Sequence, residues 1–497
     1  MVFLGTTRFK ILVIFTVGLF VSQVLSFIHV YLSNIVYQDT LAAITHAGYL
    51  AVPSQVAASE LKTFFAAFNG GLFFTLTIGL CLIVLSFLFA WLLYRLPVRS
   101  TLTFILPFVV WLFCLVYTNL EGFSSLVFFQ FFVIPPITFI LSMKVLLHHR
   151  EKQTGKNPTM HMAIFTAFAI FTASSADMNI FLDIRDGLLL NTPVGRSINA
   201  FYYDNSLYAA RVFKSPGQRL LKTCDLNSEI PIFLKKKIIK RLLLHDYIPV
   251  ESNVTPDLYI EKNGEELEFK CRDSLVTKSS IEDFLEKHTA VLNHFEQESD
   301  HHGFFRRFTM FSILFIGVLI IFLVLYLPFY FLLKKFISLK KACLIAGALC
   351  IFSGWFFSTQ FLGGYQVNDE NLMEIFESSD VDSRVAALKY IHRNHIGISV
   401  FQFYPDITKT DNIAERYWFT KILRDRRGPL VRKTLVKLLD DPHFNVVCMA
   451  FHALGYTGSK KNITEIIKRI KTSDNWYEQW YAYKAMRRLG WKQKRLE

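Results

Sequence analysis

The sequence predicts a mainly α-helical, polytopic membrane protein with a small α+β soluble domain and a C-terminal α-solenoid, that is, a stack of paired helices. Three observations predict this fold. Hydrophobic residues make up 52% of the 497 residues and gather in runs of about 20, long enough as helix to cross about 30 Å of hydrocarbon. Residues 183–307 are more polar and mix helical with alternating patterns. The last quarter of the chain repeats a pattern of capping and small residues.

Seven apolar runs are predicted to span the membrane. No small-residue cleavage site follows the first run, so we expect an anchor rather than a cleaved signal peptide. The fourth run contains Pro135 and Pro136, which should kink it. Five runs lie in a membrane domain over residues 1–182 (11–32, 72–94, 102–120, 126–147 and 162–182), and two form a hairpin over residues 308–361 (311–333 and 342–361).

The charges that flank the runs predict an orientation. Arg8 and Lys10 precede the first run, Arg95 and Arg99 follow the second, and Glu121 stands between the third and the fourth. Because basic residues favour the cytoplasmic side, the N-terminus is predicted to be cytoplasmic. If the fifth run also spans, the C-terminus lies outside the cytoplasm. We therefore expect an integral protein of the plasma membrane or the cell's inner membrane.

The fifth run contains a carboxylate, Asp177. Carboxylates inside a membrane are costly and often functional, which favours a permease-like protein with the fourth and fifth runs along its path. A helix end that faces water explains the same residue without any transport.

Residues 183–307 are predicted to form the α+β domain. Pro231 opens a helix that runs to Leu244, since proline suits a first helical turn. Pro249 makes the short strand 247–250 an edge strand. Two further strands, 258–262 and 267–271, flank Asn263-Gly264, a strong signal for a tight hairpin. An amphipathic helix is predicted over residues 281–295.

Two groups of side chains in this domain suggest chemistry. Cys224 and Cys271 could form a disulfide if the domain is exported, and are otherwise ordinary thiols. A cluster that precedes the sixth run has ligands suited to zinc or another first-row metal, although a polar helix end would have the same composition. Its members are His294, Glu298, Asp300, His301 and His302.

The C-terminal region, residues 369–497, contains one well-defined repeat. Its matching residues are Asp441, Pro442, Val446, Ala450, Ala453, Leu454 and Gly455. This pattern resembles the HEAT-like repeat of the phycobilisome-lyase type, with Val447 at a position where that family has arginine. The aspartate would cap a helix, the alanines would let helices approach closely, and Gly455 would end the helix in a left-handed turn. Weaker copies start at Asp380 and Ser473.

The resemblance implies a surface that binds another protein. The membrane part of the chain resembles no family that we recognise. The net charge of +14 is concentrated at the C-terminus, where residues 411–497 hold 19 Lys/Arg against 9 Asp/Glu. Anionic lipid is a second candidate ligand for this surface, and nucleic acid is not favoured. The residues predicted to bind the partner are Arg424, Arg426, Arg427, Arg432, Lys433, Arg487 and Arg488.

The sequence favours a membrane scaffold or assembly protein over an enzyme. It contains no GxGxxG, P-loop, HExxH or GxSxG motif, so no cofactor is predicted. Two alternatives stay open. One is a permease-like subunit of a transporter complex, and the other is a membrane enzyme that acts on lipid through the His/Asp/Glu cluster.

Overall fold

The computed structural model describes residues 2–95, 102–148, 158–175, 182–251, 254–361, 367–397 and 407–495. Helices account for 73% of the structure, which confirms the mainly α-helical class. Five helical stretches are long and apolar enough to cross a membrane, which is consistent with a membrane protein. They are Phe9–His46, Phe64–Tyr94, Ser125–His148, Gly303–Leu333 and Leu339–Phe356.

Two of the seven predicted spans are shorter than expected. The third run forms α4 (Leu102–Thr118), a helix of 17 residues or about 25 Å, because the chain leaves the helix before Leu120. The fifth forms α6 (Pro158–Ser175), whose apolar part within the described residues is Met160–Ser174. Composition had extended the third run past the end of its helix, and the last part of the fifth run, residues 176–181, lies outside the described residues. Asp177 lies outside the described residues.

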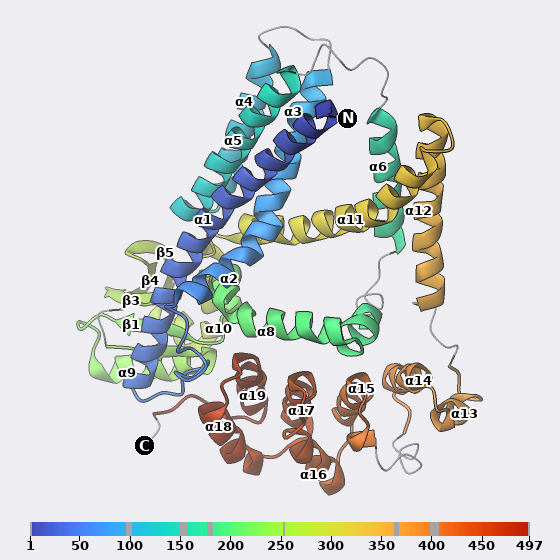
Figure 1. Ribbon diagram of the computed structural model, residues 1–497. Helices are drawn as coiled ribbons and strands as arrows, with labels where there is room; N and C mark the ends of the chain where they lie inside the picture. The colour runs from blue at the N-terminus through green and yellow to red at the C-terminus, as the bar shows by residue number, and fades with distance from the viewer. Residues whose placement is uncertain are drawn as a thin grey trace.

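The membrane helices form two groups (Figure 1). In the first, α1 (Val2–His46) packs against α2 (Phe64–Phe74) and α5 (Ser125–His148). The helix α2 continues through a π-helical turn, η1 (Thr75–Gly79), into α3 (Leu80–Arg95). The second group holds α6 and α12 (Leu339–Phe361), and α11 (Gly303–Leu333) bridges the two.

A five-stranded sheet with the order β2-β1-β3-β4-β5 forms the core of the α+β domain. The strands are β1 (Lys222–Leu226), β2 (Tyr247–Pro249), β3 (Leu258–Asn263), β4 (Glu266–Cys271) and β5 (Ser274–Ser280), with helices α9 (Ile232–Leu242) and α10 (Ile281–Glu298). The edge position of β2 and the tight β3–β4 hairpin confirm two predictions. Asn263 pairs with Glu266 across the hairpin, and Gly264 has a φ of +61° there. The strands β1 and β5 were not predicted.

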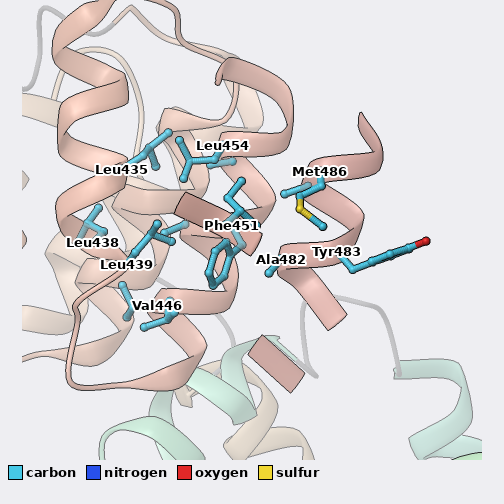
Figure 2. Packing of buried hydrophobic residues seen from close by; sticks show 14 of the residues in the cluster. Leu435, Leu438, Leu439, Val446, Phe451, Leu454, Ala482, Tyr483 and Met486 are labelled. Atoms are coloured by element: carbon cyan, nitrogen blue, oxygen red, sulfur yellow. The ribbon is translucent and has the colours of Figure 1, made fainter. Parts of the chain in front are cut away.

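The described residues of the C-terminal region, 367–397 and 407–495, contain seven α-helices. Four of them lie side by side and are called the inner helices: α14 (Val381–Asn394), α15 (Ile413–Leu423), α17 (Phe444–Thr457) and α19 (Trp476–Arg488). Behind them lie the outer helices α13 (Leu372–Glu377), α16 (Pro429–Leu438) and α18 (Ile463–Thr472). Figure 2 shows how side chains of α16, α17 and α19, among them Leu435, Phe451 and Met486, fill the space between the helices.

The inner helices repeat the same contacts at their N-termini. Asp380, Asn412 and Asn475 each accept a hydrogen bond from the backbone N–H three residues ahead, which caps the helix. Four residues after the first two caps, Arg384 and Arg416 each donate to a backbone carbonyl six residues back. Gln479 does the same in α19, at the same offset from its cap.

The third inner helix, α17, has no side-chain hydrogen bond to the carbonyl six residues back, because Val447 occupies the position equivalent to Arg384 and Arg416. A cavity of about 230 Å³ lies beside it, between α17, α18 and α19, and Val447, Arg469 and Glu478 are among its lining residues. Arg384 pairs with Glu415, 31 residues further on, at 2.5 Å. Glu478 lies 31 residues after Val447, so it is the equivalent of Glu415 in the last repeat. Because α17 has Val447 where α14 has Arg384, Glu478 receives no arginine partner from α17.

One expectation about the repeat is wrong. Gly455 does not end its helix in a left-handed turn, since α17 continues to Thr457. A Cβ atom at Gly455 would lie 3.0 Å from the Cα atom of Ala485 in α19. The glycine is needed for the close approach of two helices rather than for a positive φ.

Candidate functional site

The inner helices are covered in part by the chain's own segment η3–α8. This segment consists of the π-helical turn η3 (Arg185–Leu190) and of α8 (Pro193–Phe213), which begins at the N-cap Thr192 and lies across the inner helices (Figure 1). The indole Nε1 of Trp418 donates to Asp186 Oδ2 at 2.7 Å, and Lys389 Nζ lies 2.9 Å from the same oxygen. Further along, Trp476 Nε1 donates to the carbonyl of Tyr203 at 3.1 Å.

Two other contacts fix the far end of the C-terminal helices. The amide of Gln493 bonds to both backbone groups of Leu50 in the segment that follows α1. The hydroxyl of Tyr483, which points away from the packed residues in Figure 2, donates to Asp246 of the α+β domain at 2.5 Å. The segment that follows α1, the α+β domain and the C-terminal helices are therefore joined by polar contacts.

Beside α8, three lysines and a histidine follow one line across all four inner helices. Lys389, Lys421, His452 and Lys484 occupy equivalent positions of α14, α15, α17 and α19, separated by 32, 31 and 32 residues. With axes about 8–10 Å apart, four neighbouring helices extend this line over about 25–30 Å. Three neighbouring cations join it. We call the seven residues the basic strip: Lys214, Lys389, Lys421, Arg424, His452, Lys484 and Arg488.

Aromatic rings support the cations of the basic strip. The Lys421 Nζ atom lies 4.1 Å from the centre of the Trp418 ring, and Lys484 Nζ lies 3.5 Å from that of Trp480. Arg488 lies over Tyr456 at 4.5 Å. The attraction of a cation to an aromatic face holds these side chains in place.

Positive charge in the strip exceeds the negative charge that could balance it. Burial, with the nearby Arg185 and Arg424, lowers the pKa of Lys421 to about 8. Burial and the proximity of Lys484 lower the pKa of Lys214 to about 8 as well. Burial, followed by Arg488 and Arg424, lowers the pKa of His452 to about 4. These groups therefore disfavour one another's charge, and a bound anion would relieve that repulsion.

Within the described residues, most of the strip has no carboxylate partner. Lys389 is paired with Asp183 and Asp186, and Arg424 with its neighbour Asp425. No described carboxylate lies within ion-pair distance of the other cations, which are Lys214, Lys421, Lys484 and Arg488. The geometry suits an extended, negatively charged ligand.

The seven residues predicted to bind a partner are not gathered in one place. Arg424 and Arg488 lie in the basic strip. Arg487 donates to the carbonyl of Leu244 at 2.6 Å and so ties α19 to the α+β domain, while Arg426 donates to the carbonyl of Ile396. The remaining three belong to the outer side, at and just before α16: Arg427, Arg432 and Lys433.

Sequence reasoning missed five residues of the basic strip: Lys214, Lys389, Lys421, His452 and Lys484. The four on the inner helices could have been found from their spacing of 31–32 residues, if the search for repeats had included the basic positions as well as the alanines. Lys214 belongs to another part of the chain, so no local pattern connects it with the strip.

The five residues proposed as metal ligands do not form a site. Asp300 pairs with Arg306, and His301 Nδ1 donates to the carbonyl of Glu121 at 2.7 Å. Among the residues that the structure describes, no group of three or more His, Cys, Asp or Glu side chains could hold a metal ion. His294 and Glu298 belong to α10, and the other three residues lie between α10 and α11, where Glu121 accepts a hydrogen bond from the backbone N–H of Phe304.

The disulfide is also not formed, and both thiols are free. Cys224 on β1 pairs in register with Leu258 on β3, and Tyr259 on β3 pairs in register with Lys270 on β4. This register places Cys271 two strands away from Cys224, at about 9–10 Å, because neighbouring strands lie about 4.8 Å apart. A disulfide needs Cα atoms within about 7 Å.

With this geometry in hand, comparison of the chain with protein-family models, curated proteins and solved structures finds no match.

Proposed function

We propose that this protein is a membrane-anchored scaffold whose C-terminal helices form a HEAT-like solenoid and present the basic strip to an acidic segment of a partner protein. The observation that carries the proposal is the strip itself. Lys421 and Lys484 stand at equivalent positions of stacked helices, each on an aromatic ring, and neither has an ion-pair partner among the described residues.

The repeated helix contacts support the HEAT-like assignment. Each inner helix packs on the next, and α13, α16 and α18 form a second layer. The N-caps Asp380, Asn412, His443 and Asn475 recur at steps of 32, 31 and 32 residues, a period typical of stacked-repeat proteins.

The composition of the strip favours a protein as the occupant. Trp, Tyr and Arg are the residues that most often dominate protein interfaces. The strip contains Arg424 and Arg488, and the rings of Trp418, Trp480 and Tyr456 lie against its cations. A length of about 25–30 Å fits about eight residues of extended acidic chain, at about 3.3 Å for each residue.

Charge reversal in the strip tests the proposal. In the double variant Lys421→Glu/Lys484→Glu, carboxylates replace two cations without a described partner, so we expect about a tenfold or greater loss of the bound partner. The measurement is quantitative co-purification of the full chain from native membranes, read for proteins that the parent retains. Lys437→Glu, on the exposed side of α16, is the matched control and should retain them. Equal retention by the double variant contradicts the proposal, and loss of anionic lipid alone would identify lipid as the occupant.

We also propose that the N-terminus is cytoplasmic and that the C-terminus is not. The basic residues that flank the first two spans support this orientation. In Figure 1 the two termini lie toward opposite ends of α1, with the C-terminal helices beyond its C-terminal end. A reporter that is active only in the cytoplasm should be inactive when fused after Glu497 and active when fused before Met1. Activity of the C-terminal fusion would refute the orientation.

A further inference from the structure

Buried polar side chains recur along α1 within the first group of apolar helices, and we call them the seam. Ser22, Ser26, His29 and Asn34 are each 5% exposed or less. Steps of four and three residues place Ser22, Ser26 and His29 on one face of the helix, whereas the step of five turns Asn34 by about 140° from His29. From Ser22 to Gln38 the seam extends about 24 Å at about 1.5 Å for each residue, and its N-terminal part overlaps the second half of the apolar run 11–32.

Polar groups from neighbouring helices complete the seam. On α5, Gln130 donates through Nε2 to Ser26 Oγ at 3.2 Å, and Thr138 is fully buried near Gly18 of α1. Thr75 of η1 is 3% exposed. Apolar packing would be the ordinary interior of such a bundle, so buried polar residues on three elements that pack on one another call for a physical reason.

Many polar atoms of the seam have no hydrogen-bond partner among the described residues. Leaving a polar atom buried and unpaired costs about 1–3 kcal/mol each, more than a stable bundle could carry at every position. Buried water is the usual partner of such atoms. The unpartnered atoms are Gln23 Oε1, His29 Nδ1, Asn34 Oδ1 and Nδ2, Gln38 Oε1, Thr75 Oγ1, Gln130 Oε1 and Thr138 Oγ1.

The π-helical turn η1 brings its span unusually close to the seam. A Cβ atom at Gly79 would lie 2.0 Å from Ser22 Oγ, so only glycine fits beside that hydroxyl. Single π-helical turns are rare within α-helices and are frequent at functional sites. The turn is thus a second observation, independent of the unpaired atoms, that marks the same place.

The seam leads toward the basic strip at its C-terminal end. A cavity of about 30 Å³ follows Gln38 along α1, and its lining includes Tyr37 and Thr40 from α1 together with Lys214 and Trp480 of the strip region. That volume holds about one water molecule. It is too small for a larger solute.

We propose that the seam holds a chain of water molecules that conducts protons across the bundle, with His29 as a relay. A proton would pass between neighbouring waters by exchange of hydrogen bonds. His29 would accept it at one ring nitrogen and release a proton from the other, so that the side chain returns to its starting state after reorientation. No oxidant or co-substrate is needed. This activity goes beyond the scaffold and would suit a permease-like subunit.

Proton flux tests the inference directly. The full chain is reconstituted in liposomes with a trapped pH-sensitive dye, and a potassium gradient with valinomycin drives protons inward. We expect the parent to acidify vesicles faster than protein-free liposomes do. His29→Phe and Gln130→Leu should each lower the added flux about tenfold or more, because both remove hydrogen-bonding atoms from the water chain. Parent vesicles no faster than protein-free ones would overturn the inference, as would an unchanged flux in both variants.

Two controls separate the seam from other effects. Thr16→Val changes an exposed hydroxyl elsewhere on α1 and should leave the flux unchanged. Lys421→Glu/Lys484→Glu should also conduct like the parent, so failure of the scaffold proposal would not affect this result. If a seam variant fails to fold, Ser26→Cys gives a second test. Silver ions that reach its thiol through water should block the flux well beyond their effect on the parent, and a flux that is no more sensitive to silver would contradict the inference.

Discussion

Replacing Arg416 by alanine is expected to destabilise the C-terminal helices by about 3–5 kcal/mol, because it leaves a buried carboxylate without its counter-charge. The Nε and Nη2 atoms of Arg416 meet the two carboxylate oxygens of Asp441 at 2.7 and 3.2 Å, and Nη1 donates to the carbonyl of Thr410 at 2.5 Å. The side chains of Arg416 and Asp441 are only 7% and 3% exposed. One substitution thus breaks a contact that joins α15 to the start of α17. Pulse proteolysis of the full chain in detergent measures the change through fragments cut beyond residue 367.

A double variant distinguishes the lost pair from the lost side chain. Arg416→Ala/Asp441→Ala removes both charges, so it should recover part of the loss seen in Arg416→Ala. Lys62→Ala serves as the control, since Lys62 and Asp39 form an ion pair in which each side chain is 45% exposed. Such exposed pairs contribute about 0–1 kcal/mol. If Arg416→Ala resisted proteolysis as well as Lys62→Ala did, the pair would have no structural role.

Local signals in the sequence located much of the α+β domain. Asn263-Gly264 predicted the β3–β4 hairpin because the turn and both strands are neighbours in the chain. The strand β1 escaped because two of its five residues are charged. Lys222 is nevertheless 6% exposed, and its Nζ atom lies 2.6 Å from Glu296 Oε1 of α10. That partner is 74 residues away, so the pattern of β1 could not show that its lysine would be buried.

The candidate site was harder to predict for the same reason. The basic composition of the C-terminal region pointed to a charged surface, and the alanine pattern to stacked helices. Which arginines face outward depends on contacts with other parts of the chain. Arg487 is held by Leu244, and the inner helices are held by Asp186 through Trp418. The polar seam, in turn, requires α1, η1 and α5 to pack on one another, which their separate compositions do not indicate.

Gly455→Val should open the contact between α17 and α19 and cost about 1–3 kcal/mol through overpacking. Gly455 is buried, and even a Cβ atom would lie 3.0 Å from the Cα of Ala485 and 3.4 Å from its Cβ. The atom nearest to the new side chain belongs to the backbone of α19 and cannot swing aside, so the helices must separate. The helix propensity of valine is better than that of glycine by only about a few tenths of a kcal/mol. This difference is too small to offset the clash.

The matched control is Gly317→Val in α11, where no heavy atom lies within 4 Å of the added Cβ. Both variants should insert in the membrane, since Gly455 lies outside the helices that could span it. Only Gly455→Val should release C-terminal fragments faster than the parent under limited proteolysis. Equal release by the two variants would mean that α17 and α19 can separate without loss. In that case, the alignment of Lys421, His452 and Lys484 would not depend on the close approach of the inner helices. Faster release by Gly455→Val together with loss of the partner would connect helix packing to the proposed function through a residue that lies inside the stack.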